Sequence, residues 1–316
     1  MNNHIKNTIL GAVLTFTTTA AWGISPSVAK AQEAYLAKDP QAVMTHIGQA
    51  LRGPKLSPAE SRNIFGLYHR TLTENRGQGD LGWTVPSQIL RLKTAVEYFD
   101  DDKDKVFRLV ISASMKQGTE LKSFTLRKYP DLMVVDMENQ IGRFDQGLDG
   151  ENSFFRARPR GQPLPIASGA YLLDFSLTTG EKVSGWFFIT DDMNSTAAPE
   201  FIGVEPGQVY NTGTPLLSWK NFVSPQHQPN DRSELVVAVS PLADNGDWGS
   251  PHWILWENNS PRTSVDLAKD KPSETAQIPL ANGNYKVQVT YNDIKNIAPL
   301  RMTRASKVAR KITIQK

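Results

Sequence analysis

The chain of 316 residues contains no cysteine. This absence excludes disulfide bonds, a thiol nucleophile, cysteine-bound metal ions and an N-terminal lipid attached through cysteine. Histidine is also scarce, with five residues, and no two of them have the His-x-x-x-His or His-Glu-x-x-His spacing of a metal site on a helix. Cysteine chemistry and a helical zinc motif are therefore excluded.

An excess of charge of one sign is missing as well. The chain has 35 basic and 32 acidic residues, and its formal net charge is +3. This balance gives no global electrostatic argument for a nucleic-acid partner. Hydrophobic residues make up 39% and aromatic residues 9% of the chain, which is enough apolar material for two or three packed domains.

Long apolar runs are absent except near the N-terminus. There, Lys6 precedes an apolar, threonine-rich stretch, and small residues stand at Ala21 and Gly23. This pattern predicts a secretory signal peptide over residues 1–23, with a second cleavage point after Ala31 as the alternative. A membrane anchor is disfavoured, because the stretch is too short to span a bilayer comfortably. Export without disulfides predicts a bacterial protein that is periplasmic or secreted, with no transmembrane segment after cleavage.

Residues 24–104 show helical periodicity. Helices are expected near residues 28–38 and 40–51, and a capping-box pattern at Ser57 begins a third. The stretch "VPSQILRLKTAVEYF", residues 85–99, repeats the apolar spacing of a helix face and predicts a fourth. The sequence therefore predicts a small N-terminal helical domain.

The pattern changes to the alternation of β-strands after residue 104. Short runs rich in branched and aromatic residues, separated by turn residues, predict a β-sandwich over residues 105–190. Residues 191–200 are small and polar and are expected to form a linker. A second series of strands over residues 201–316 predicts a second sandwich.

One phrase occurs in both series, as "PIASGAYLLDFS" at residues 165–176 and "PLANGNYKVQVT" at residues 279–290. A glycine at each place, Gly169 and Gly283, would allow a sharp corner. The tyrosines that follow are expected to bury their rings and to hydrogen-bond back to the corner backbone through their hydroxyls. Tyr171 and Tyr285 are therefore assigned a structural role in two tandem sandwiches.

The second series resembles bacterial fibronectin type III and immunoglobulin-like modules. The resemblance rests on "VEPGQVYNTGTPLLSWKNF", residues 204–222, where a Pro-Gly turn precedes a strand that contains Trp219, and on the phrase around Tyr285. It covers about residues 201–316, with a fainter copy at about 105–190. The resemblance implies two tandem antiparallel β-sandwiches. Together with the helical pattern of residues 24–104, this predicts a multidomain α + β protein with a small N-terminal helical bundle. The resemblance implies no activity, because this fold hosts many functions.

The densest aromatic patch is "NGDWGSPHWILWENN", residues 245–259. Trp253 and Trp256 belong to a strand-like run with apolar residues on both faces, so one of them is expected in a core. Trp248 lies in a Gly/Asp-rich turn and is the candidate for an exposed contact, with His252 beside it. An exposed tryptophan near polar amides is typical of surfaces that stack sugar rings.

The C-terminal run after Asp293 is basic and contains no acidic residue. Arg304, Lys307 and Lys311 could meet an anionic envelope surface. A charged edge strand that discourages aggregation is the favoured alternative.

The loop "RFDQGLDGENSFF", residues 143–155, is the only candidate metal site that the sequence offers with any weight. Oxygen ligands from Asp145, Asp149 and Glu151 on a glycine-containing loop could hold Ca²⁺, but a plain hairpin turn is favoured. No cofactor is otherwise expected, and no catalytic residue is proposed.

These patterns favour an exported binding or scaffolding protein without enzymatic activity. Its partner would be an envelope or secreted protein, or a glycan, and no nucleic acid is expected. The alternative is a secreted hydrolase or glycan-active enzyme with sandwich accessory domains, which would need a cleft between the helical domain and the first sandwich. A secreted adhesin or effector subunit is a third hypothesis.

Overall fold

The computed structural model describes residues 24–75, 83, 85–100, 105–160, 165–194, 199–220, 232–242, 249–273, 279–297 and 300–316. The expected signal peptide, residues 1–23, and Trp248 lie outside these ranges. Within them, no helix combines the length and the apolar character needed to cross a membrane.

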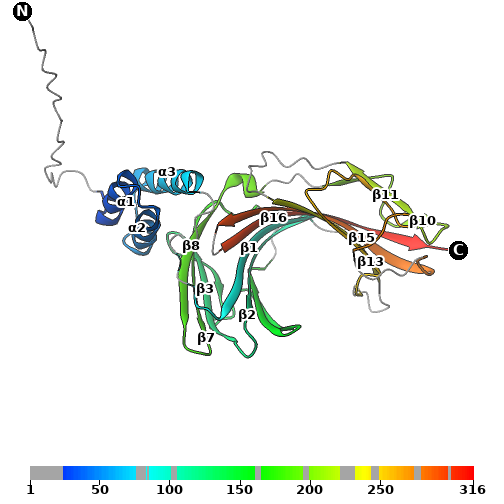
Figure 1. The fold of residues 1–316 in the computed structure, drawn as a ribbon, viewed down its shortest axis with the longest axis horizontal. Coiled ribbons are helices and arrows are strands. Elements are labelled where there is room, and N and C mark those ends of the chain that lie inside the picture. The colour runs from blue at the N-terminus through cyan, green and yellow to red at the C-terminus, as the bar shows by residue number, and fades with distance from the viewer. Residues whose placement is uncertain are drawn as a thin grey trace, which may run out of the picture.

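Three helices open the described part of the chain: α1 (Pro26–Leu36), α2 (Pro40–Arg52) and α3 (Pro58–Glu74). Each begins with proline in its first turn, where the missing N–H leaves no hydrogen bond unmade. The expected capping box is present at α3, where the Ser57 and Glu60 side chains each accept a hydrogen bond from the other's backbone N–H. The helices lie at one end of the molecule (Figure 1).

The fourth helix predicted over residues 85–99 is wrong, because Ile89–Asp100 form strand β1. The helix-like spacing of apolar residues arose because a central strand buries side chains on both of its faces. Leu92 and Val96 point into a core, while Ala95 and Phe99 are buried on the opposite face. Pairing with strands on both sides outweighed the local helical pattern.

The first sandwich consists of two sheets that enclose a core. One sheet has the order β4-β3-β7-β8. Facing it are strands β1, β2, β6 and β5. The bounds are β1 (Ile89–Asp100), β2 (Lys105–Met115), β3 (Leu121–Lys128), β4 (Leu132–Asp136), β5 (Arg143–Asp149), β6 (Asn152–Arg158), β7 (Gly169–Leu177) and β8 (Lys182–Ile189).

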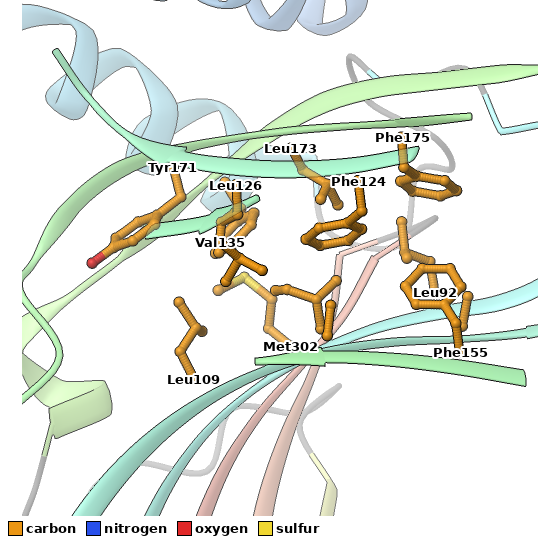
Figure 2. Close-up of a cluster of buried hydrophobic side chains, with 14 of the residues drawn as sticks. Leu92, Leu109, Phe124, Leu126, Val135, Phe155, Tyr171, Leu173, Phe175 and Met302 are labelled. Atoms are coloured by element: carbon orange, nitrogen blue, oxygen red, sulfur yellow. The ribbon is translucent and has the colours of Figure 1, made fainter. Parts of the chain in front are cut away.

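Aromatic rings fill the core of the first sandwich. Figure 2 shows Phe124 and Phe175 reaching down from one sheet to Phe155 on the other. The ring centroids of Phe155 lie 5.8 Å from Phe124 and 5.3 Å from Phe175, in edge-to-face geometry. Met302, from the last strand of the chain, lies in the same core (Figure 2).

The second sandwich places the three-stranded sheet β14-β11-β9 against strands β13, β12, β15 and β16. A short helix, η1 (Asp191–Asn194), precedes it, within the range expected as a linker, and its Met193 is buried in the first core. The bounds are β9 (Glu200–Ile202), β10 (Gln208–Tyr210), β11 (Leu216–Lys220), β12 (Arg232–Pro241), β13 (Trp253–Asn258), β14 (Ser264–Asp266), β15 (Gly283–Ile297) and β16 (Leu300–Ile314).

One continuous sheet joins the two sandwiches, in the order β13-β12-β15-β16-β1-β2-β6-β5 with β10 also paired to β16. Strand β16 lies between β15, which is antiparallel to it, and β1, which is parallel to it from Leu92–Leu300 to Asp100–Val308. The expected edge strand at the C-terminus is therefore wrong. Side chains of β16 project above and below the sheet, so their charge does not prevent the backbone from pairing along both edges.

Both sandwich cores lie on the same face of this nine-stranded sheet. Alternate residues of β16 share a face, and Met302 enters the first core while Val308 and Ile312 enter the second. The four-stranded and three-stranded sheets thus cover two sections of one face. The long strands β15 and β16 run between these sections in Figure 1.

The helices pack on the outside of the four-stranded sheet and form a third core. In β8, Phe187 and Ile189 point inward, whereas Trp186 and Phe188 meet the helices. Tyr68 of α3 lies 5.3 Å from Trp186 and 4.7 Å from Phe188 between ring centroids. The molecule therefore stacks helices, a four-stranded sheet and the long sheet in three layers at its N-terminal end.

Candidate binding face

The repeated phrase forms the same corner twice. Gly169 and Gly283 have φ angles of 133° and 154°, which favour glycine. Tyr171 Oη donates to the carbonyl of Ala167 at 2.6 Å, and Tyr285 Oη donates to that of Ala281 at 3.1 Å. Burial raises the pKa of Tyr171 to about 12 and also raises that of Tyr285, so both hydroxyls remain donors. These residues are structural.

Trp219 is also structural. Its ring is 1% exposed in the second core, and its Nε1 donates to Tyr291 Oη at 3.0 Å. Tyr291 Oη in turn donates to the carbonyl of Arg262 at 2.9 Å. This chain of hydrogen bonds ties β11 to β15 across the sandwich.

The face of the nine-stranded sheet opposite the two cores is the candidate functional surface, and we call it the outer face. The alternation of each strand assigns side chains to it. It contains the odd-numbered residues 91–99 of β1 and 301–313 of β16, and the even-numbered residues 106–114 of β2, 232–240 of β12, 254–258 of β13 and 286–294 of β15. At the far edge, residues 154–158 of β6 and 143–149 of β5 continue it on every second position.

Basic side chains outnumber acidic ones on the outer face. The basic residues are Arg91, Lys93, Arg108, Arg143, Arg156, Arg158, Arg232, Lys286, Arg301, Lys307 and Lys311, and the acidic ones are Glu97, Asp145, Asp149 and Glu234. This excess is larger than the +3 of the whole chain. The rest of the chain is therefore net acidic, and the charges are segregated.

Glu97 lies at the centre of one group of cations. Its Oε1 is 2.9 Å from Nζ of Lys307. Burial raises the pKa of Glu97, but Lys307, Lys93 and Arg108 together outweigh this and hold the pKa below its ordinary value. The carboxylate is therefore ionised and links β1 to β16.

Glu234 lies at the centre of a second group. Its Oε1 is 2.5 Å from Arg232 Nη2 and 2.9 Å from Arg301 Nη2. Burial opposes ionisation of Glu234, yet the two arginines leave its pKa below the ordinary value. The ion pair with Arg301 connects β12 to β16, so both acidic groups join strands across the centre of the long sheet.

Three aromatic side chains belong to the outer face: Phe154 at its far edge on β6, Phe99 on β1 and Trp256 on β13. Phe99 is 8% exposed and lies beneath two cations, with Lys286 Nζ 4.8 Å and Arg108 Cζ 5.4 Å from its ring centroid. Trp256 is 51% exposed. The outer face thus combines cations with a buried aromatic ring beneath them, Phe99, and a solvent-exposed aromatic ring, Trp256.

Of the tryptophans and the histidine singled out in the sequence, Trp253 is buried in the second core and Trp256 is exposed. His252 lies just before β13, with its ring in edge contact with Tyr285 at 6.1 Å. It points away from the outer face, and Trp248 lies outside the described residues. Among the tryptophans of the described part, Trp256 is the exposed one.

The three basic residues singled out in β16 do not form one cluster. Arg304 lies on the core side of the sheet, 8% exposed, and forms an ion pair with Asp293. Lys307 and Lys311 lie on the outer face. Arg301, from the same basic run, lies on the outer face as well. Lys93 and Phe99 also belong to it. The sequence analysis missed these two because it predicts a helix over residues 85–99, where a period of two would have placed alternate residues together.

The residues considered for Ca²⁺ lie on the β5–β6 hairpin. Asp145 and Asp149 are four residues apart on an extended strand, about 13 Å, and Asp145 forms an ion pair with Arg158 at 3.4 Å. Glu151 is in the exposed turn. Across the described ranges, no group of three or more His, Asp or Glu side chains is placed to hold a metal ion.

The joint between the helices and the first sandwich is filled by side chains. Arg52 Nη2 donates to Ser184 Oγ at 2.7 Å and lies 3.3 Å from Asp174 Oδ1. Gly48 packs so closely on Trp186 that an added Cβ would lie 2.7 Å from its Nε1. The cleft that an enzyme was expected to need at this joint is occupied by Trp186, Phe188 and the side chains of the helices.

No protein-family model matches the chain. Among curated proteins, enolase-phosphatase E1 of Schizosaccharomyces pombe is 22% identical over 185 residues, covering 53% of this chain and 85% of that protein. This identity is too low to assign the chain to that family.

Solved structures that resemble the chain consist of immunoglobulin-like or fibronectin-like domains. The N-terminal Ig1-2 module of the Drosophila receptor protein tyrosine phosphatase DLAR is 15% identical with a TM-score of 0.30, covering 73% of this chain and all of that one. The tandem Ig repeats of Dlar are 14% identical with a TM-score of 0.32, covering 72% and 96%. The chicken CNTN1 FN1-FN3 domains are 12% identical with a TM-score of 0.20, covering 71% and 68%. The chain is a mostly β protein with neighbours of this domain type.

Proposed function

We propose that the protein is an exported, non-enzymatic binding or scaffolding protein of the bacterial periplasm or cell surface. The observation that supports this function is the outer face, a single basic surface that extends across both sandwiches. A surface built on paired strands is rigid, so its side chains are held in place before a partner arrives. Its segregated charge would attract a partner of opposite sign.

The hydrolase hypothesis has no comparable support in the structure. It depended on a cleft beside the helical domain, and Trp186, Phe188 and Tyr68 fill that joint with aromatic contacts. The adhesin hypothesis shares the same binding face and differs from the leading one in location only. Fractionation of cells that produce the full chain distinguishes a periplasmic from a secreted product.

Photo-crosslinking tests the proposed function. A photoreactive amino acid is placed at Gln288 on the outer face, or at Lys182, which is exposed at the start of β8 on the other side of the molecule. With envelope and culture fractions, we expect reproducible adducts from position 288 and none of the same adducts from position 182. Equal labelling from both positions, or none from position 288, would contradict the proposal.

A further inference from the structure

We infer that the outer face binds an acidic polysaccharide, with sugar rings stacked on Trp256 and its anionic groups held by the lysines and arginines of β15, β16 and β1. This inference rests on the proposed function and names the class of its ligand.

Cations face cations across neighbouring strands of the outer face. Lys286 is directly opposite Lys311 in the β15–β16 pair, and Lys93 is level with Arg301 in the β1–β16 pair. Arg143 and Arg158 repeat the arrangement between β5 and β6. Like charges directly opposite each other destabilise a sheet, whereas opposite charges stabilise it. Arg301 and Arg158 already pair with Glu234 and Asp145. A polyanion lying across these strands would add counter-charge where cations outnumber the carboxylates beside them.

Three of the four acidic residues of the outer face, Glu97, Asp145 and Glu234, already form ion pairs with cations. The carboxylates of Glu97 and Glu234 each interact with more than one basic side chain. Burial lowers the pKa of Lys93, and although Glu97 counteracts this, Arg301 and Lys307 add to the lowering. The surface therefore has an excess of positive charge that its own carboxylates do not balance, and an anionic ligand complements it.

The position of Trp256 favours a sugar polymer over other polyanions. The register aligns Trp256 with Val236 on β12, Thr290 on β15 and Lys307 on β16. Since strands are about 4.8 Å apart, the indole and Lys307 are separated by about 14 Å. An exposed aromatic ring offers an apolar face to a sugar ring, while amide side chains at Gln288 and Asn292 lie between the ring and the cations.

The composition of the outer face disfavours a protein partner. The buried centres of protein interfaces are depleted of charged residues, lysine among them, although arginine is enriched over protein interfaces. Here the section from β15 to β16 carries Lys286, Lys307 and Lys311. On β16 the side chains that alternate with the two lysines on this face are small, with Ala305 before Lys307 and Ala309 between Lys307 and Lys311. Such a basic, polar surface is suited to repeated anionic groups along a chain.

The test measures binding of the full chain to four polymers: alginate, a polyuronate; inorganic polyphosphate, an anion without rings; dextran, a neutral sugar polymer; and poly-thymidine DNA. The variants are Trp256→Ala and the double variant Lys286→Gln/Lys311→Gln. The matched control is Lys122→Gln/Lys182→Gln, in two exposed lysines away from the outer face. Dissociation constants are measured at several salt concentrations.

We expect alginate to bind with a strong salt dependence and dextran not to bind. The double variant should weaken alginate binding by about tenfold, and Trp256→Ala by roughly 3- to 10-fold with no effect on polyphosphate. The control should bind normally. Equal binding of alginate and polyphosphate with no effect of Trp256→Ala, tighter binding of DNA, or no binding of alginate would each overturn the inference. If alginate does not bind but crosslinking at position 288 still captures a partner, only the polysaccharide inference fails and the proposed function stands.

Discussion

Glu97 and Lys307 form an ion pair, with 2.9 Å between Oε1 and Nζ, that joins the first strand of the chain to the last. Glu97 is on β1, whose other face forms the first core. Lys307 is next to Val308, which enters the second core. The pair therefore lies where the two sandwiches meet, and the same lysine contributes to the basic outer face.

We expect Glu97→Gln to destabilise the protein at neutral pH, because three basic side chains lose their carboxylate. The loss should be about 1–3 kcal/mol. The folded pKa of Glu97 is below its unfolded value, so its stabilising contribution is present above the unfolded pKa and is lost as the pH falls through the folded pKa. Thermal unfolding of both forms should thus differ at pH 7, and the difference should shrink progressively as the pH falls below about 4, the ordinary value of a glutamate. A difference that grows toward acid would contradict this assignment.

Removing either corner hydroxyl should cost similar amounts of stability. Tyr171→Phe and Tyr285→Phe each delete one hydrogen bond to the backbone, for which we expect about 0.5–1.5 kcal/mol. Tyr35→Phe is the matched control, because Tyr35 Oη donates to Glu74 at an exposed position and should contribute little. Urea unfolding measures all three. A corner variant as stable as the control would show that the tyrosine acts through its ring alone.

Two helical glycines should respond oppositely to alanine. Gly48→Ala places a methyl group 2.7 Å from Trp186 Nε1 and should destabilise the packing of α2 on β8, by about 1–3 kcal/mol. Gly66 of α3 has nothing within 4 Å of an added Cβ, so Gly66→Ala should stabilise by up to about 1 kcal/mol through helix propensity. Limited proteolysis of the helices and thermal unfolding should rank the variants in this order. Equal effects would mean that the helices are not held by this contact.

Interrupting β16 should weaken both sandwiches together. Ala305 pairs with Asn292 on β15 and is level with Glu97 on β1, so Ala305→Pro removes ladder hydrogen bonds at the junction and should cost about 3 kcal/mol or more. Hydrogen exchange should increase in β1 and β2 as well as in β12 and β15.

Gln146→Pro is the control for this experiment. Gln146 lies on β5, at the edge of the long sheet and remote from the second sandwich. Its proline variant should raise exchange near β5 and β6 only. If Ala305→Pro raised hydrogen exchange in only one of the two sandwiches, the sandwiches would be independent modules rather than parts of one sheet.

The sequence by itself determined the local features of the fold. Proline, serine and glutamate at Ser57–Glu60 specify a helix start through backbone hydrogen bonds within four residues. Glycine and tyrosine at the two corners act within five residues, as the hydroxyl bonds to Ala167 and Ala281 show. The absence of cysteine, which excludes disulfide bonds, is likewise known from the sequence alone. Such features depend only on neighbouring residues, so they can be read directly from the chain.

The tertiary structure alone decided that the two sandwiches share a sheet. Residues 89–100 have the spacing of a helix, and only their pairing with β2 and β16, the latter more than two hundred residues away in sequence, makes them a strand. The same long-range pairing separates Arg304 from Lys307 and Lys311 and brings Lys93 and Phe99 beside them. Residues that are far apart in the chain but level across strands create the outer face, and local sequence patterns contain no information about that register.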